Sequence, residues 1–213
     1  MKIKNAQLSW QKLANDYNLS SLQIEKFKLY ANLLVGWNQK FNLTAITDLC
    51  DIIDYHFYDS LALSKFIDLN QVNTLADIGT GAGFPGLALK ILQPNLNLIL
   101  IEAQGKKVEF LQVVIEKLEM DRVLLEQTDW RTFLRTSTNQ INLFCARASL
   151  ELAELLRIFK PSSAYLNATL VYWASQRWWE DPDNLKLSPV RFDYRVGDRN
   201  LTLALFKNGP CKE

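Results

Sequence analysis

The chain of 213 residues carries 24 basic and 23 acidic side chains, and 48% of its residues are apolar. These proportions are typical of a soluble globular protein, and its apolar runs are too short to span a bilayer. The formal net charge of +1 gives no support for nucleic-acid binding, which usually leaves a basic excess. The only basic spacing that stands out is Arg191, Arg195 and Arg199, which we expect to be solvated positions on and between strands.

The three cysteines, Cys50, Cys145 and Cys211, are far apart and fit neither a disulfide framework nor a metal-ligand spacing. With one histidine and no Cys-x-x-Cys motif, the sequence predicts no zinc site. Residues 1–10 lack the apolar core of a secretion signal. We therefore expect a metal-free protein of the reducing cytoplasm without a membrane partner, and nothing in the sequence demands more than a monomer.

The first part of the chain is predicted to be helical. Ser20, followed three residues later by a glutamine, indicates a capping box, and apolar residues then recur at helical spacing. The residues of this stripe are Leu22, Phe27, Tyr30, Leu33, Leu34 and Trp37. After a break at residues 38–44, another helix is expected over residues 48–66. We predict a helical extension of residues 1–70, packed on a core of residues 71–213.

From residue 72 onward, strands alternate with helices. The predicted strands are Val72–Ile78, Leu96–Ile101, Arg122–Glu126, Ile141–Ala146, Tyr165–Trp173, Arg191–Val196 and Leu201–Phe206, and the predicted helices are Leu87–Leu92, Lys106–Leu118 and Leu150–Phe159. This alternation is typical of the α/β class: a Rossmann-like, mostly parallel sheet with helices on both faces, which binds ligands at the carboxyl ends of its strands. The last two strands have no helix between them, so we predict an antiparallel hairpin at one edge.

Residues 77–86 form a glycine-rich turn between a predicted strand and a predicted helix. Gly79, Gly81 and Gly83 allow a sharp turn and the close approach of a ligand to the backbone. A dinucleotide-binding turn has the spacing Gly-x-Gly-x-x-Gly, whereas this turn has Gly-x-Gly-x-Gly after Asp77. A carboxylate there would repel a pyrophosphate but suits an amino or sulfonium group. The turn therefore favours S-adenosylmethionine over a nicotinamide cofactor, and a purely structural turn is the alternative.

An acidic residue, Glu102, ends the second predicted strand about 20 residues beyond the glycine turn. A carboxylate in this position can accept hydrogen bonds from both hydroxyls of a ribose. A strand-end acid is unremarkable on its own. At this spacing after such a turn, however, we assign Glu102 to the ribose of the cofactor.

At this point the chain resembles a known family, the bacterial 16S rRNA guanine-N7 methyltransferases called RsmG, formerly GidB. The resemblance lies in residues 37–44, 56–61, 77–86, 105–111 and 146–148. Its most specific parts are His-Phe-Tyr-Asp-Ser-Leu at residues 56–61 and Gly-Phe-Pro-Gly at the end of the turn. The resemblance implies a class I methyltransferase sheet with an N-terminal helical extension and S-adenosylmethionine as cofactor. It also implies methylation of a guanine N7 in the 530 loop of 16S rRNA, with 16S rRNA or the 30S subunit as partner.

The resemblance further implies which residues contact the cofactor. Carried over by position, these contacts fall on Gly79, Phe84, Asp129, Trp130 and Arg147, and Glu102 matches the family's acidic ribose position. The chain departs from the family at Asp129 and Trp130, where the family usually has Ala-Glu. Either the acid has moved by one position, or the indole stacks on the adenine.

Guanine N7 already carries an in-plane lone pair, so its methylation requires no prior removal of a proton. The enzyme must instead hold an unstacked base in line with the sulfonium methyl group. We therefore assign no catalytic base, and His56 and Arg147 are candidates for positioning. The alternatives are that His56 packs the helical extension on the core and that Arg147 forms a surface ion pair.

Four further residues have two interpretations each. Lys106 and Lys107 open a predicted helix and either contact RNA phosphates or line a solvated face. Trp178 and Trp179 are adjacent and form either an RNA-stacking surface or a packed lid. Two other functions remain open for the whole chain. One is a methyltransferase acting on another RNA or a small molecule, and the other is a non-catalytic cofactor-binding module.

Overall fold

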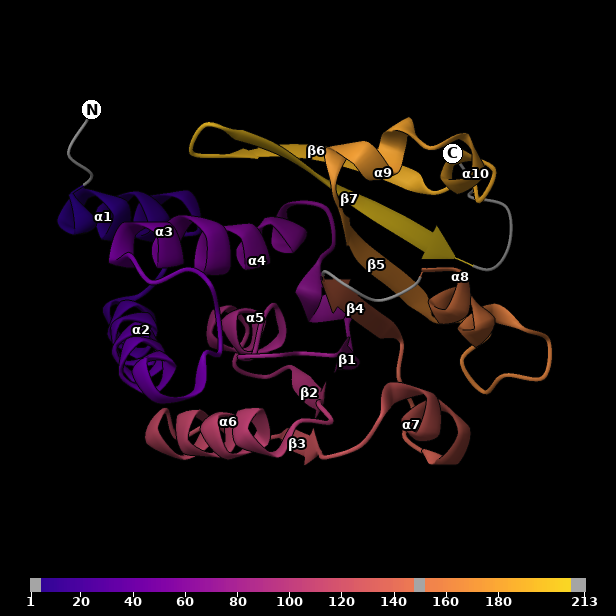
Figure 1. Ribbon diagram of the computed structural model, residues 1–213, viewed down its shortest axis with the longest axis horizontal. Coiled ribbons are helices and arrows are strands. Elements are labelled where there is room, and N and C mark those ends of the chain that lie inside the picture. The colour runs from indigo at the N-terminus through magenta and orange to yellow at the C-terminus, as the bar shows by residue number, and fades with distance from the viewer. Residues whose placement is uncertain (1–4, 148–151, 208–213) are drawn as a thin grey trace.

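In the computed structural model, which describes residues 5–147 and 152–207, a seven-stranded sheet lies at the centre of the molecule (Figure 1). The strands are β1 (Thr74–Ile78), β2 (Asn97–Ile101), β3 (Val123–Glu126), β4 (Leu143–Arg147), β5 (Thr169–Ala174), β6 (Val190–Val196) and β7 (Arg199–Lys207). Their order in the sheet is β3-β2-β1-β4-β5-β7-β6. Strands β1 to β5 pair in parallel, whereas β7 is antiparallel to both β5 and β6. The α/β class, the mostly parallel sheet and the antiparallel hairpin are confirmed.

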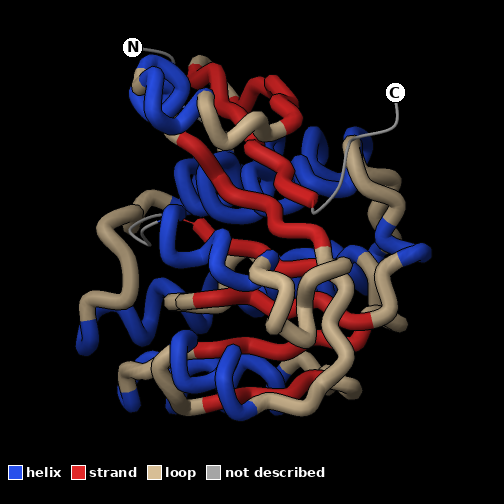
Figure 2. Tube along the Cα trace, turned by 90° about the vertical axis from the view of Figure 1, so that its right-hand side faces the viewer, coloured by secondary structure: helices blue, strands red, loops and turns tan. Residues whose placement is uncertain are grey.

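Helices cover both faces of the twisted sheet (Figure 2). Those that follow β1 are α5 (Gly86–Leu92), α6 (Gly105–Lys117), α7 (Trp130–Thr136), α8 (Leu152–Leu155), α9 (Gln176–Glu180) and α10 (Pro182–Leu185). The helix predicted over residues 150–159 begins outside the described residues, and its described part is α8 and the 3-10 helix Leu156–Phe159. Strand β5 begins at Thr169 rather than at Tyr165, because residues 164–167 form a turn. The buried side chain of Tyr165 gave this turn the apolar pattern of a strand.

The chain before β1 is mainly helical. It contains α1 (Ala6–Asp16), α2 (Ser21–Phe41), α3 (Leu49–Ile52), a π-helical segment (Ile53–Tyr58), α4 (Asp59–Leu61) and two 3-10 segments (Ala62–Lys65 and Leu69–Gln71). The helix expected over residues 48–66 is therefore present, with a π-helical turn at its centre, and such turns are frequent at functional sites. None of the helices in the described part of the chain is both long and apolar enough to cross a membrane.

The capping box at the start of α2 is present. The Ser20 hydroxyl accepts a hydrogen bond from the backbone N–H of Gln23, whose side chain accepts one from the backbone N–H of Ser20. The break expected from residue 38 was placed too early, because α2 continues to Phe41 and ends at Asn42, whose φ is 48°. Asn38 stays helical, and its side chain bonds both backbone groups of Thr44.

Two buried apolar clusters lie on the two faces of the sheet. One contains side chains of α1 and α2 together with those of α5 and α6, and the other contains side chains of α7, α8 and α9. Phe57, from the π-helical segment, is completely buried at the centre of the first cluster. The centroid of its ring lies 5.0 Å from that of Phe27, 5.4 Å from Tyr30 and 5.7 Å from Phe84. The boundary at residue 70 stays a prediction, since these helices and the sheet share one cluster.

Replacing Phe57 by alanine should lower the free energy of unfolding by about 3–5 kcal/mol, because several rings lose a buried neighbour. Urea denaturation measures this change. The Leu22→Ala variant is the control, since Leu22 is 68% exposed and its loss should cost less than about 0.5 kcal/mol. Equal losses in the two variants would contradict the packing of the N-terminal helices on the sheet.

Candidate functional site

The carboxyl ends of four parallel strands meet at one edge of the sheet. Ile78, at the end of β1, is in register with Ile101 of β2 and Ala146 of β4, and Ile101 is in register with Glu126 of β3. The glycine turn, Glu102 and Arg147 follow or end these strands, so the sheet brings them to one place. Ligands of parallel α/β sheets bind at this edge.

The glycine turn has a backbone that favours glycine. Gly79, Gly81 and Gly83 have φ angles of 64°, 62° and 96°, all in the left-handed region. A Cβ atom added to Gly81 would meet only the carbonyl oxygen of Gly79, at 4.0 Å. A Cβ atom added to Gly83 would lie 2.5 Å from Leu87 Cδ1. Gly83 is therefore required for packing, whereas Gly81 leaves open space in which a ligand can approach the backbone.

Asp77 joins the two ends of this turn. Its completely buried carboxylate accepts hydrogen bonds through Oδ2 from the Thr80 hydroxyl at 2.6 Å and the backbone N–H of Gly86 at 2.8 Å. Oδ1 has no hydrogen-bond partner among the described residues. Burial raises the pKa of Asp77 to about 6. One oxygen thus fixes the turn, and the other is buried without a partner in the described part of the chain.

Glu102 is held beside the turn by backbone groups. Its Oε2 accepts a hydrogen bond from the N–H of Gly81 at 3.0 Å, and its Oε1 accepts one from the N–H of Gln104 at 2.9 Å. The residue is 6% exposed. Since each carboxylate oxygen can accept more than one hydrogen bond, Glu102 is oriented and still able to accept bonds from two hydroxyls.

Phe84 stacks on two rings from the N-terminal helices. Its ring stacks on Tyr30 of α2, with a centroid distance of 5.1 Å and an interplanar angle of 13°. It also stacks on His56, at 4.5 Å and 10°. The Tyr30 hydroxyl also donates a hydrogen bond to the carbonyl of Ala82. We call Tyr30, Phe84 and His56 the three-ring stack, and it fixes the glycine turn against the N-terminal helices.

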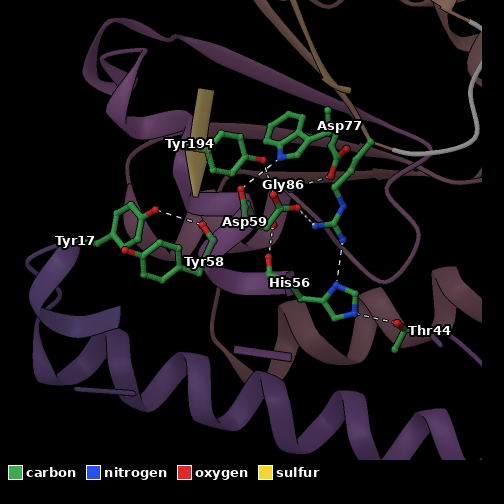
Figure 3. Close-up of polar contacts among 11 residues, drawn as sticks. Tyr17, Thr44, His56, Tyr58, Asp59, Asp77, Gly86 and Tyr194 are labelled. Carbon is green, nitrogen blue, oxygen red and sulfur yellow. Dashed lines mark hydrogen bonds and ion pairs between the residues drawn. The ribbon is translucent and has the colours of Figure 1, made fainter. Parts of the chain in front are cut away.

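His56 is hydrogen-bonded at both ring nitrogens (Figure 3). A guanidinium can only donate, so His56 Nδ1 accepts from Nη2 of Arg147, 3.2 Å away. Nε2 therefore carries the proton and donates to the Thr44 hydroxyl at 2.9 Å. Burial and the nearby Arg147 charge lower the pKa of His56 to about 3. His56 is thus a neutral side chain near pH 7, and it positions Arg147.

The Arg147 guanidinium is oriented by a buried carboxylate as well. Its Nη1 donates to Oδ2 of Asp59 at 3.1 Å, and the two side chains are only 17% and 12% exposed. Asp59 accepts further bonds from the Tyr194 hydroxyl and, at its backbone carbonyl, from Trp173 Nε1 (Figure 3). Burial raises the pKa of Asp59, and the Arg147 charge opposes this rise. Tyr194 also belongs to the site, although no sequence motif indicated it. It lies in β6, far along the chain from Asp59, so no local pattern joins the two residues.

Asp129 and Trp130 have structural partners. The Asp129 side chain caps α7 by accepting hydrogen bonds from the backbone N–H groups of Arg131 and Thr132. The Trp130 indole is 8% exposed, packs in the second apolar cluster and carries the Arg131 guanidinium 4.5 Å from its ring centroid. The assignment of the adenine of the cofactor to Asp129 and Trp130 stays a prediction.

The paired tryptophans lie away from the three-ring stack, against β5 and β7. Trp179 is 9% exposed, and its Nε1 donates to the Thr202 hydroxyl. Trp178 is half-buried, 4.7 Å from Trp179 and 6.3 Å from Phe206 between ring centroids. Both indoles therefore pack on the sheet.

The two lysines lie in the first turn of α6. Lys106 is exposed, and its Nζ lies 5.5 Å from the ring centroid of Phe41, whereas Lys107 is partly buried. Contact of either lysine with a phosphate stays a prediction.

Solved structures with the same fold include methyltransferases. A methyltransferase from Geobacter sulfurreducens matches with a TM-score of 0.60 and 17% identity, over 83% of this chain and 88% of that chain. M. capricolum TrmK, solved in complex with S-adenosyl-homocysteine, matches with a TM-score of 0.52 and 14% identity, over 71% and 68%. The sheet is therefore that of a class I methyltransferase, as predicted.

The family is shown by sequence. The model of GidB, described as rRNA small subunit methyltransferase G, matches residues 23–180. Ribosomal RNA small subunit methyltransferase G of Bacillus subtilis (strain 168) is 36% identical over 146 residues, which are 68% of this chain and 61% of the relative. The protein of that name from Desulfitobacterium hafniense (strain Y51) is 44% identical over 145 residues, 67% and 59%. The chain belongs to this family, which confirms the resemblance, and the match spans about six-tenths of these relatives' length.

Replacing Arg147 by methionine should lower the free energy of unfolding by about 3–5 kcal/mol at pH 8, because Asp59 loses its buried cation. The pKa of Asp59 is already raised, and removal of the cation raises it further. The folded variant then binds a proton that the unfolded chain has released, so the loss should shrink as the pH falls toward 5. Urea denaturation at the two pH values measures this. Arg147→Lys keeps the charge and should lose less, and an equal loss for Arg147→Met at both pH values would contradict the assignment.

Proposed function

We propose that this chain is an S-adenosylmethionine-dependent methyltransferase that methylates N7 of a guanine in the 530 loop of 16S rRNA. The observation that supports this most is the three-ring stack, which joins the glycine turn to the arginine at the end of β4. Two of its members, His56 and Phe84, lie in the family's most specific segments. An rRNA substrate places the reaction in the cytoplasm, and action as a monomer without metal stays a prediction.

The residues at the carboxyl edge fit S-adenosylmethionine, which supplies an electrophilic methyl group when bound. The open space at Gly81 suits a ligand that lies against the backbone of the turn. The unpartnered Oδ1 of Asp77 suits an amino group, and Glu102 suits the two ribose hydroxyls. By position in the family, Asp129 and Trp130 are assigned to the adenine, and Gly79 and Phe84 to the cofactor. Gly83 is assigned to the cofactor as part of the glycine turn.

The side chains near the turn suit positioning rather than proton transfer. His56 is neutral, and both of its nitrogens are engaged, so it offers no base near pH 7. Methylation of N7 needs none, because the lone pair is already free. Asp59 and His56 take two of the five N–H donors of Arg147, and the remaining donors can hold the guanine or its phosphate. Lys106 and Lys107 are assigned to phosphates of the RNA.

A labelling experiment tests the substrate. The protein is incubated with S-adenosylmethionine labelled in its methyl group and with either 30S subunits or protein-free 16S rRNA, and the label is mapped. We expect label at N7 of one guanine in the 530 loop. Label on a protein, a small molecule or another RNA, with 16S rRNA unlabelled, would contradict the proposal. Calorimetry with S-adenosylhomocysteine tests the alternative of a non-catalytic module, since a module that has lost its cofactor should show no binding.

The Gly81→Val variant should lose cofactor binding while remaining folded. The valine side chain enters the open space of the turn, and the left-handed φ costs about 1–2 kcal/mol of stability. Calorimetry with S-adenosylhomocysteine measures binding, and urea denaturation measures stability. Gly197→Val is the matched control, because Gly197 has a φ of 57° in the β6–β7 turn. Unchanged cofactor affinity in Gly81→Val would refute the placement of the cofactor.

A further inference from the structure

The edge hairpin of the sheet reaches past the end of β4. Arg147 is in register with Trp173 of β5, which pairs with Leu203 of β7, which in turn pairs with Phe192 of β6. Strand β6 runs in the same direction as β5 and continues for four more residues, to Val196. At about 3.4 Å per residue, Arg195 therefore lies roughly 10 Å farther along the strand direction than Arg147. This direction leads beyond the carboxyl ends of the parallel strands, where the glycine turn lies. Figure 1 shows this hairpin extending past α4 toward α1.

The two faces of β6 have different surroundings. Phe192 and Tyr194 face the N-terminal helices, where Phe192 stacks on Phe66 with a centroid distance of 4.7 Å and Tyr194 bonds Asp59. The alternate residues, Arg191, Asp193 and Arg195, are exposed on the opposite face. The contacts of Phe192 and Tyr194 fix the hairpin to the N-terminal helices. The exposed face with Arg191, Asp193 and Arg195 is therefore held in a fixed position.

A polar groove of about 430 Å³ lies on this second face, beside α9. Its lining residues are Gln176, Arg191, Asp193, Tyr194, Arg195, Asn200 and Thr202. Gln176 lies two residues after the end of β5, and Asn200 pairs with Arg195 across the hairpin. The groove therefore opens at the carboxyl edge of the sheet.

The groove has an excess of positive charge. Asp193 pairs with Arg191, whose Nε lies 2.8 Å from its Oδ1 and whose guanidinium lies 4.9 Å from the Trp179 ring centroid. Arg195 uses only Nε, which donates to the carbonyl of Gly197 at 3.1 Å, and no acidic side chain of the described residues pairs with it. Both terminal nitrogens of Arg195 thus remain available. Two such nitrogens form the fork that binds a phosphate with two hydrogen bonds.

We propose that this groove binds phosphates of the RNA strand next to the target guanine, with Arg195 as its principal contact. The inference rests on the proposed function and adds a binding surface to it. Arginine forks and side-chain amides are the groups that contact phosphates in nucleic-acid complexes, and Arg195, Gln176 and Asn200 supply them here. A base held at the glycine turn has neighbouring nucleotides within reach of the hairpin. The overall charge of the chain conceals this local excess.

Binding of a transcribed 16S rRNA fragment that contains the 530 loop tests the proposal, measured by fluorescence anisotropy over a range of salt concentrations. Arg195→Ala should weaken binding about five- to tenfold. It should also lower the slope of log affinity against log salt concentration by about 0.7–0.9, the value for one lost phosphate contact. Arg195→Lys should restore the slope but only part of the affinity. Asp193→Asn frees Arg191 and should strengthen binding about twofold or more.

Arg122→Ala is the matched control. Arg122 is exposed and directly precedes β3, the outermost strand on the opposite side of the sheet from β6. If Arg195→Ala binds the fragment as tightly as Arg122→Ala does, while the wild type methylates it, the groove proposal fails and the proposed function stands. If the wild type neither binds nor methylates the RNA, both fail. A loss of affinity for 30S subunits but not for the protein-free fragment would identify a ribosomal protein as the occupant and overturn the RNA assignment.

Discussion

The stacking of Phe84 on Tyr30 and His56 is the contact on which the rest of the site depends. Each aromatic pair contributes about 0.5–1.5 kcal/mol beyond the burial of its surface, and both pairs have their rings within 13° of parallel. Because Phe84 is part of the glycine turn, this packing fixes the turn. Because His56 bonds Arg147, the same packing also fixes the arginine at the end of β4. The N-terminal helices therefore shape a site whose ligand-binding groups come from the sheet.

The charges of the site are arranged around Arg147. Burial of an ion pair costs desolvation energy, so the Arg147–Asp59 pair is better explained by the geometry it imposes than by added stability. His56 completes the arrangement as a neutral acceptor, since a second cation would repel the guanidinium. Tyr194 joins Asp59 to β6, so the outermost hairpin is anchored to the same buried charges. A fixed cation beside the glycine turn is what positioning chemistry requires.

Local patterns were sufficient to predict the alternating strands, the glycine turn, the capping box at Ser20 and the edge hairpin. They could not predict that Tyr30 or Tyr194 reaches the site, since both contacts join residues far apart in the sequence. The start of β5 was placed too early, because a buried turn and a buried strand share an apolar pattern. The length of α2 was underestimated, because Asn38 has a helical backbone despite its low helix propensity.

The protonation state of His56 tests the central claim most directly, and the chain has only one histidine. Labelling with ¹⁵N-histidine therefore gives a single pair of ring nitrogen signals, which NMR can follow from pH 5 to pH 8. Burial in the three-ring stack and the hydrogen bond from Arg147 predict a neutral ring, with its proton on Nε2 throughout this range. A ring that titrates near pH 6.5, or that carries its proton on Nδ1, would contradict the stack and the role of His56 in holding Arg147.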